Sequence, residues 1–216
     1  YYNIGRLQSG FGQLGNAGLL LASTIRGRDY DNVVGTDLAL RGRSQVVSLA
    51  LLASNSRGPT GNASSGVAGQ ALYGFRNRRF SATALGEHFG RDFRMDTAFL
   101  NQVGLTNGWA FASVSAHPRW GARLGLQRIM PFVRGQLGRD REQGGDVWSA
   151  QSGLTLNFTR SGYVRMDATL GQEPWAQREF RTWRLRALSQ AQLTRWLYVS
   201  AFTSRARSIF YDPADP

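Results

Sequence analysis

Ser115 and His117 form one of two groups of side chains in this sequence that could carry out chemistry. A serine beside a histidine can act as a nucleophile with its general base. The two residues are two positions apart, so a strand would place them on one face but about 7 Å apart, too far for the activating hydrogen bond. We therefore predict no catalytic site and interpret His117 as a histidine at the rim of the fold, next to Pro118.

The second group is a run of carboxylates with one histidine between residues 87 and 96. Its members are Glu87, His88, Asp92 and Asp96. Carboxylate oxygens bind cations such as Ca²⁺, but Arg91 and Arg94 lie inside the same run and can neutralise the acids instead. We favour these Asp–Arg pairs and predict neither a metal site nor a cofactor. The chain has no cysteine, which excludes disulfides and thiolate ligands, and it contains no P-loop, HExxH or nucleophile-elbow pattern.

The segments around these groups alternate between apolar and polar residues, as half-buried strands do. In residues 33–54 the apolar side chains have a period of two, and the apolar run is far shorter than the roughly 20 residues of a transmembrane helix. A two-residue turn at Gly42-Arg43 makes a hairpin in which Leu38 faces Val47. One side of this hairpin is apolar, and the other is small and polar.

A second hairpin is predicted over residues 148–170, around the three-residue loop 160–162, whose glycine takes the positive φ. In that register Thr155 faces Asp167 on a polar side, opposite an apolar wall.

A third hairpin, over residues 183–205, is predicted to turn at Thr194-Arg195 and to separate two groups of side chains. The apolar side holds Trp183, Leu185, Ala187, Ala191, Leu193, Trp196, Tyr198, Ser200 and Phe202. The polar side holds Arg184, Arg186, Gln190, Gln192, Thr203 and Arg205.

Eleven such alternating runs can be followed between residues 14 and 204, with no helix between them. The longer connections, 55–65, 138–146 and 171–179, alternate with tight turns, and short turns at one end with long loops at the other are typical of outer-membrane barrels. We predict an all-β fold over residues 1–216, an antiparallel up-and-down transmembrane β-barrel with about eleven strands that form part of a larger barrel. A soluble β-sandwich or jelly roll is the alternative, although its strands are usually five or six residues long.

All 26 basic residues are arginine, and with 14 acids they give a net charge of +12. A GC-rich genome would also favour arginine over lysine. Such a charge suits nucleic acid, lipid headgroups or anionic solutes, but the arginines are spread along the whole chain, on the polar side of strands or beside turns. We therefore predict that they line a lumen and its rim. The lumen candidates are Asp37, Arg41, Asn157, Arg165, Asp167, Arg184 and Arg186, and the candidates for an aromatic girdle are Trp148, Trp183, Trp196 and Tyr198.

Three stretches of the sequence carry a resemblance to a known family. They are residues 5–58, residues 86–104 (GEHFGRDFRMDTAFLNQVG) and residues 194–206 (TRWLYVSAFTSRA), and the most specific is LGEHFGRDFRMDTAFL at 85–100. Together they resemble bacterial proteins in which a module similar to family-nine carbohydrate-binding domains precedes a C-terminal outer-membrane β-barrel of unknown function. The resemblance implies location and shape, and it implies that an N-terminal module and the first and last strands of the barrel are missing from this chain.

We therefore expect a non-enzymatic protein of the bacterial outer membrane that acts as a pore, an anchor or a binding protein for glycans or anionic envelope components. Its expected partners are outer-membrane lipids, lipopolysaccharide and glycans or other envelope proteins, and not nucleic acid. The alternatives are a soluble basic β-domain that binds nucleic acid, in which arginine and aromatic residues would share one face, and a hydrolase built on a barrel.

Overall fold

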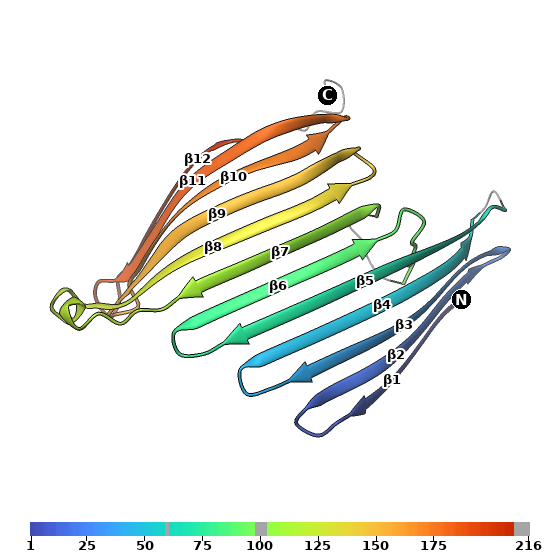
Figure 1. Cartoon of the computed structure of the whole chain (residues 1–216), viewed down its shortest axis with the longest axis horizontal. Coiled ribbons are helices and arrows are strands. Elements are labelled where there is room, and N and C mark those ends of the chain that lie inside the picture. Colours follow the sequence, from blue (N-terminus) through green and yellow to red (C-terminus); the bar gives the residue numbers. More distant parts are fainter. Residues whose placement is uncertain (59–60, 98–102, 210–216) are drawn as a thin grey trace. The chain divides into compact units, whose positions relative to one another are not determined.

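The computed structural model describes residues 1–58, 61–97 and 103–209, and it consists almost entirely of β-strands (Figure 1). Twelve antiparallel strands lie in one sheet in the order of the sequence, so the predicted all-β, up-and-down arrangement is confirmed. The strands are β1 (Tyr2–Gly10), β2 (Gly15–Arg26), β3 (Asp29–Arg41), β4 (Gln45–Arg57), β5 (Ala63–Arg76), β6 (Phe80–Phe89), β7 (Leu105–Val114), β8 (Leu126–Asp140), β9 (Gly145–Phe158), β10 (Tyr163–Trp175), β11 (Arg178–Gln192) and β12 (Tyr198–Arg207). A short 3₁₀ helix, η1 (Arg119–Leu124), precedes β8.

No helix in the described ranges is long and apolar enough to cross a membrane.

The strand that the sequence did not predict is β1, which raises the number from eleven to twelve. It pairs with β2 from Tyr2 opposite Thr24 to Gly10 opposite Asn16. Its sequence, YNIGRLQSG, has too few apolar residues for a period of two to stand out. Pairing with β2 therefore sets the conformation of β1.

The chain divides into two compact units. Unit 1 comprises residues 1–75, 84–108 and 138–144, and it contains β1 to β4 and nearly all of β5. Unit 2 comprises residues 76–83, 109–137 and 145–216, and it contains β9 to β12. Strands β6, β7 and β8 contribute residues to both units. Each unit is described by itself below.

The hairpin of β3 and β4 has the predicted faces but not the predicted pairs. The amide of Gly42 donates to the carbonyl of Gln45 at 2.9 Å, so the loop is 43–44, one residue later than predicted. Leu38 consequently lies opposite Leu49 instead of Val47. A shift of two positions keeps every side chain on its face, which is why the hydrophobic pattern could not detect it.

The hairpin of β9 and β10 is shifted by two positions in the same way. Asp167 lies opposite Gly153, not opposite Thr155. The positive φ angles fall on Arg160 and Ser161, both at 56°, and not on the following glycine as predicted. Two consecutive positive φ values are those of a type I′ turn, whose twist matches that of the flanking strands.

The hairpin of β11 and β12 contradicts the prediction more strongly. The amides of Leu193 and Thr194 donate to the carbonyl of Leu197, which places Trp196 in the loop. The register is therefore changed by one position, and a one-residue slip moves every side chain of a strand to the other face. Two residues that were predicted on the apolar side, Tyr198 and Phe202, share the face of Arg186, whereas Arg205 pairs with Leu185.

The predicted contrast between short turns and long loops is also wrong. Strands continue into the segments that the sequence assigned to loops, so these connections shrink to residues 58–62, 141–144 and 176–177. Polar residues of these segments pair across the strands, for example Asn32 with Asn55. The long connections are 90–104, after β6, and 115–125, after β7.

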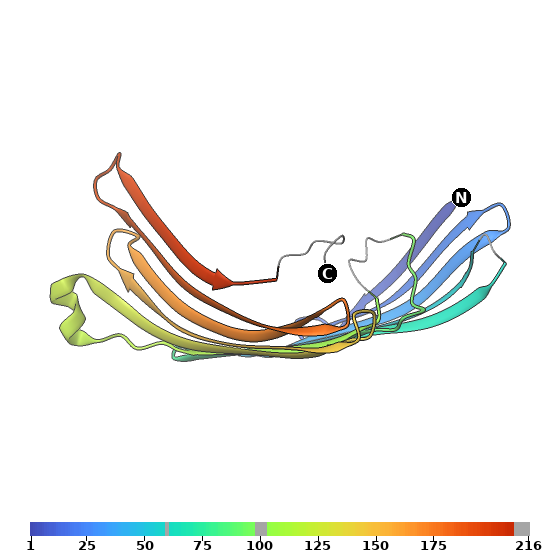
Figure 2. The ribbon, with the colours of Figure 1, turned by 90° about the horizontal axis from the view of Figure 1, so that it is seen from above.

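The registers define two faces in each unit, because alternate side chains of a strand point to opposite sides. The apolar face of unit 1 carries Leu19, Leu21, Val34, Leu40, Leu49, Leu51, Val67 and Tyr73, and its polar face carries Thr24, Asp31, Asp37, Ser54, Ser56 and Gln70. The apolar face of unit 2 carries Trp148, Leu154, Leu156, Val164, Met166, Leu170, Trp183 and Leu185, and its polar face carries Gln151, Thr155, Asn157, Arg165, Asp167, Arg184, Arg186 and Gln190. Within unit 1, the segment that follows β6 lies on the side towards which the strands curve (Figure 2).

Candidate functional site

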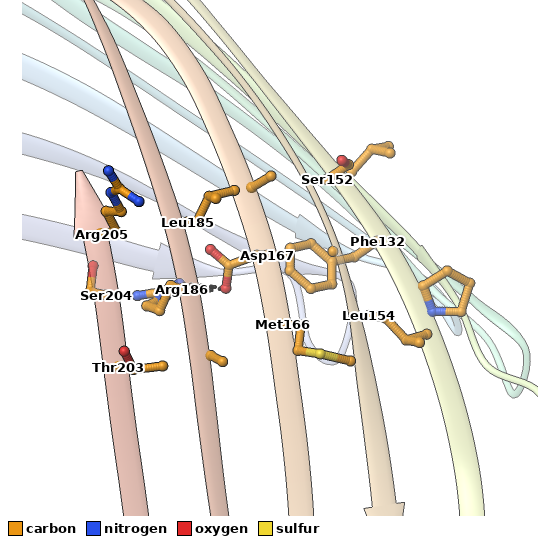
Figure 3. A pocket seen from close by; sticks show the side chains of 15 residues that line it. Phe132, Ser152, Leu154, Met166, Asp167, Leu185, Arg186, Thr203, Ser204 and Arg205 are labelled. Atoms are coloured by element: carbon orange, nitrogen blue, oxygen red, sulfur yellow. Dashed lines mark hydrogen bonds and ion pairs between the residues drawn. The ribbon is translucent and has the colours of Figure 1, made fainter. Parts of the chain in front are cut away.

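Asp167, in the middle of β10, is the centre of a polar cluster in unit 2. Its side chain is only 1% exposed. Its Oδ1 accepts a hydrogen bond from Gln151 Nε2 at 2.8 Å, and its Oδ2 accepts from Arg186 Nε and Nη2 at 3.1 and 3.0 Å and from Arg165 Nε at 3.2 Å. Asp167 lies directly opposite Arg186 on β11, so the sheet register itself brings the pair together (Figure 3). Two guanidinium groups share one carboxylate, and the cluster is net positive.

An aromatic ring packs against this cluster. Phe132 of β8 is 4% exposed, and the guanidinium carbon of Arg165 lies 4.5 Å from its ring centroid, a cation–π contact. Phe111 packs on the same ring at 5.9 Å between centroids. Gly153 makes room for it, because a Cβ there would lie 2.5 Å from Phe132 Cζ and 2.7 Å from Asp167 Cβ. The sequence prediction missed these residues, although a glycine inside a strand often marks such a close approach.

The hydrogen bonds of Asp167 determine what the cluster can do. Both of its oxygens accept hydrogen bonds, so it fixes the guanidinium groups of Arg165 and Arg186 instead of acting as a free base. Each guanidinium has five N–H donors, which leaves donors for a carboxylate, phosphate or sugar oxygen. Arg184 lies on the same face, opposite Thr169, and is exposed. The polar face of unit 2 is therefore suited to anionic and hydroxyl-rich solutes.

Asn157, the remaining lumen candidate of unit 2, lies on the same polar face, opposite Tyr163. Within the described part of the chain its Nδ2 is buried without a hydrogen-bond partner. The structure thus brings Arg165, Asp167 and Arg186 into one cluster and leaves Asn157 nearer the turn end of the strands.

In unit 1, Asp37 and Arg41 both lie on the polar face of β3. Asp37 Oδ1 pairs with Nη2 of Arg6, on β1, at 3.1 Å. Gly18 leaves the space for this carboxylate, since a Cβ there would lie 2.5 Å from Asp37 Oδ1. Arg41 lies at the end of the strand and is exposed.

The segment 90–97 packs onto the polar face of unit 1. Phe93 is 2% exposed, and its backbone lies so close to Gly66 of β5 that a Cβ there would be 2.2 Å from its nitrogen. The amide of Arg94 donates to Ser54 Oγ at 3.1 Å. A second hydrogen bond, made by Asp96, joins this segment to β3. The whole segment is thus attached to the face that the sequence assigned to a lumen.

That second contact comes from Asp96, whose amide donates to Asp31 Oδ2 at 2.7 Å. The carboxylate of Asp96 also accepts from Arg94 Nε at 2.8 Å, so the predicted Asp–Arg pairing is formed at these two residues. This hydrogen bond, together with the charge of Asp96, raises the pKa of the Arg94 guanidinium.

The other members of the predicted acidic cluster contact different partners. Arg91 pairs with Glu142 at 3.6 Å and not with an aspartate. Glu87 Oε1 accepts a hydrogen bond from the side-chain Nδ2 of Asn107, and His88 Nδ1 lies 2.8 Å from the hydroxyl of Thr106. In the described ranges no three acidic or histidine side chains converge on a point where a metal ion could bind.

Ser115 and His117 do not lie on one strand, contrary to the prediction. Strand β7 ends at Val114, and the amide of Ser115 donates to the carbonyl of Arg79, the residue before β6. Ala116 forms an isolated bridge with Ile129 of β8, and His117 is exposed in the connection before η1. The two side chains therefore have no common face from which to act together.

The apolar faces of both units are exposed. In unit 1, Leu51 is 62% exposed and Val67 is 58% exposed, and in unit 2 Leu170 is 60% exposed. Along β2 to β5, a described region, the apolar face of unit 1 has no charged side chain except Arg57, at a strand end.

The aromatic girdle candidates fall in different places. Trp183 lies opposite Leu170, and Trp148 lies opposite the next residue of β10 on that face, Gln172, so the two tryptophans occupy neighbouring levels of the apolar face. Trp196 is in the loop and 83% exposed, and Tyr198 lies on the polar face, opposite Gln192.

Comparisons of the chain with protein-family models, with curated proteins and with solved structures gave no match. The resemblance to barrels that follow a carbohydrate-binding module stays a prediction.

Proposed function

We propose that the chain is part of an outer-membrane β-barrel of a bacterial envelope, without enzymatic activity, whose polar faces line a wet interior. The observation that carries this proposal is the exposure of the apolar faces. Soluble monomers rarely expose a contiguous apolar patch of more than a few hundred Å², yet leucines and valines cover one face of β2 to β5 from strand to strand. Hydrocarbon is the solvent that suits such a face.

The dimensions of the strands support the proposal. Tyr30 and Leu40, both on the apolar face of β3, are ten residues apart, which is about 34 Å along a strand. Tilted by about 40°, this length covers roughly 25 Å, the height of the apolar band of an outer-membrane barrel. Most strands here have 12 to 15 residues, where a soluble sandwich would have about half as many.

The interior of the proposed barrel would be basic. The polar face of unit 2 presents Arg165, Arg184 and Arg186 with Asp167 as the acid among them. Rings of arginine side chains favour anions in a pore. We therefore infer that the barrel passes or binds anionic solutes or acidic glycans, with Asp167 holding two of the arginines in place.

The test is envelope fractionation of cells that express the full-length protein, followed by gel electrophoresis with and without boiling. We expect the protein in the outer-membrane fraction and a change of mobility on boiling, because an intact barrel binds less detergent than an unfolded chain. A soluble protein with one mobility would contradict the proposal.

One observation favours a second candidate, a soluble domain that binds single-stranded nucleic acid. The guanidinium carbon of Arg134 lies 5.0 Å from the ring centroid of Trp109, and Phe202 shares the face of Arg186, so aromatics and arginines do meet in unit 2. Phe132, the aromatic at the Asp167 cluster, is however buried and cannot stack on a base. Salt-dependent binding of single-stranded RNA by a soluble form would support this second candidate.

A further inference from the structure

Three arginines of unit 2 lie on the apolar face, where a lipid-facing surface should have no charge. Arg207 lies directly opposite Trp183, and Arg205 lies directly opposite Leu185. Arg181 is two residues from Trp183 on β11 and therefore shares its face. All three are exposed, and within the described part of the chain their side chains have no hydrogen bond or ion pair. On a face that meets lipid, as proposed above, these charges need an anionic partner from outside the chain.

The sheet register brings the three side chains close together. Arg205 and Arg207 are successive residues of one face, about 7 Å apart along β12. Arg181 and Arg207 are diagonal neighbours across β11 and β12, with a separation of about 7 Å. An arginine side chain is about as long as these separations, so the three guanidinium groups can meet on one anionic group. Among the described residues the nearest acid on this face is Glu179, one level further along β11, and it leaves the group net positive.

The neighbours of these arginines give the depth of the group. Trp148 and Trp183 lie at the same end of the apolar face, and tryptophan is enriched where hydrocarbon meets headgroups. Arginine on the lipid face is strongly destabilising at the membrane midplane but only weakly so near the interface. The position beside the tryptophans is thus where three lipid-facing arginines can be tolerated, with the long side chain of Arg205 reaching towards the headgroups.

A shallow hollow of about 740 Å³ lies on the apolar face, and Arg205 is one of its lining residues (Figure 3). Its lining includes Leu154, Met166, Ala168 and Leu185, and Arg205 lies at its edge. Leu185 and Arg205 lie at the same height on adjacent strands, so an apolar surface passes directly into a cationic one. An amphiphile with acyl chains and an anionic headgroup matches both parts.

We propose that the apolar face of β9 to β12 binds a phosphorylated glycolipid of the lipopolysaccharide type, with its phosphate on Arg181, Arg205 and Arg207 and an acyl chain in the hollow. Guanidinium groups bind phosphate oxygens through paired, charge-assisted hydrogen bonds. At this end of the strands, β10 and β11 continue beyond Trp148 and Trp183 with charged residues that include Glu173, Arg178 and Glu179. This inference rests on the proposed function, since it needs the apolar face to be embedded in lipid.

The experiment uses the full-length protein purified in detergent and titrated with bis-phosphorylated lipid A, with dephosphorylated lipid A and with phosphatidylglycerol. The variant is Arg181→Gln/Arg205→Gln/Arg207→Gln. The matched control is Arg195→Gln, which removes an exposed arginine from the turn between β11 and β12, at the other end of these strands. We expect the triple variant to bind phosphorylated lipid A at least about tenfold more weakly, because each charge-assisted contact contributes on the order of 1.5 kcal/mol. The control should bind like the wild type.

Three results would overturn the inference: equal binding by the triple variant and the wild type, equal binding of the dephosphorylated lipid, or binding of phosphatidylglycerol as strong as that of lipid A. Fractionation and the mobility shift on boiling are measured first for every variant, which keeps failure of this site distinct from failure of the barrel. If the triple variant loses the shift, the single variant Arg207→Gln replaces it in the titration, with the same outcomes deciding.

Discussion

Leu51 offers the sharpest test of which solvent meets the apolar face. It lies near the middle of that face on β4, opposite Thr36, and is 62% exposed. If the face met water, Leu51→Arg would be an ordinary surface substitution, and the free energy of unfolding would change by less than about 0.5 kcal/mol. If the face meets hydrocarbon, the same arginine costs about 2–4 kcal/mol, which is a roughly 30- to 700-fold change in the folding equilibrium.

The control for this variant is Gln70→Arg. Gln70 is exposed on β5 at almost the same height but on the polar face, where it lies opposite Ala50 and therefore at the same level as Asp37. The new charge therefore meets water and an acid, and we expect little change in stability. Urea unfolding of the full-length protein from lipid vesicles, followed by tryptophan fluorescence, gives both free energies. A value for Leu51→Arg within 0.5 kcal/mol of that of the control would refute the assignment of this face to lipid.

The remaining predictions concern two glycines whose missing side chains leave room for other groups. Gly153→Ala should destabilise unit 2 by about 1–3 kcal/mol, since the new Cβ would lie 2.5 Å from an aromatic carbon and 2.6 Å from a backbone oxygen; Gly135→Ala, with no atom within 4 Å of its Cβ, is the control in the same urea assay. Gly66→Ala should displace the segment 90–97 from the polar face of unit 1, because the new Cβ would lie 2.2 Å from Phe93 N. Amide hydrogen exchange should then become faster in that segment, whereas exchange in the strands should stay the same. The control is Gly74→Ala, whose new Cβ would have no atom closer than 4.0 Å and should leave the exchange rates unchanged. Slow exchange of the segment in both variants would show that the contact between Gly66 and Phe93 does not hold it.

The sequence by itself determined the strand architecture, because a period of two is a local property of the chain. It also determined which side chains share a face wherever the predicted register was wrong by two positions, because such a shift keeps every side chain on its face. The prediction for Asp167 shows this: its partner on β9 was two residues wrong, yet it lies on the same face as Arg165 and Arg186, as predicted. The pattern of charged and apolar residues was sufficient to assign these side chains to a face, because neighbouring residues in a strand alternate between the apolar and the polar face.

Only the tertiary structure decided the odd shift in register and the contacts between distant segments. The hydrogen bonds from the amides of Leu193 and Thr194 to the carbonyl of Leu197 move Tyr198 to the polar face and Arg205 to the apolar face. Both faces of β12 mix apolar and polar residues, so the hydrophobic pattern does not choose between the two registers. The attachment of Phe93 to Gly66 depends on a close approach of two backbones, and no property of either segment alone specifies the other as its partner. Local alternation sets the faces, whereas turn geometry and the packing of backbones far apart in the sequence decide what each face contacts.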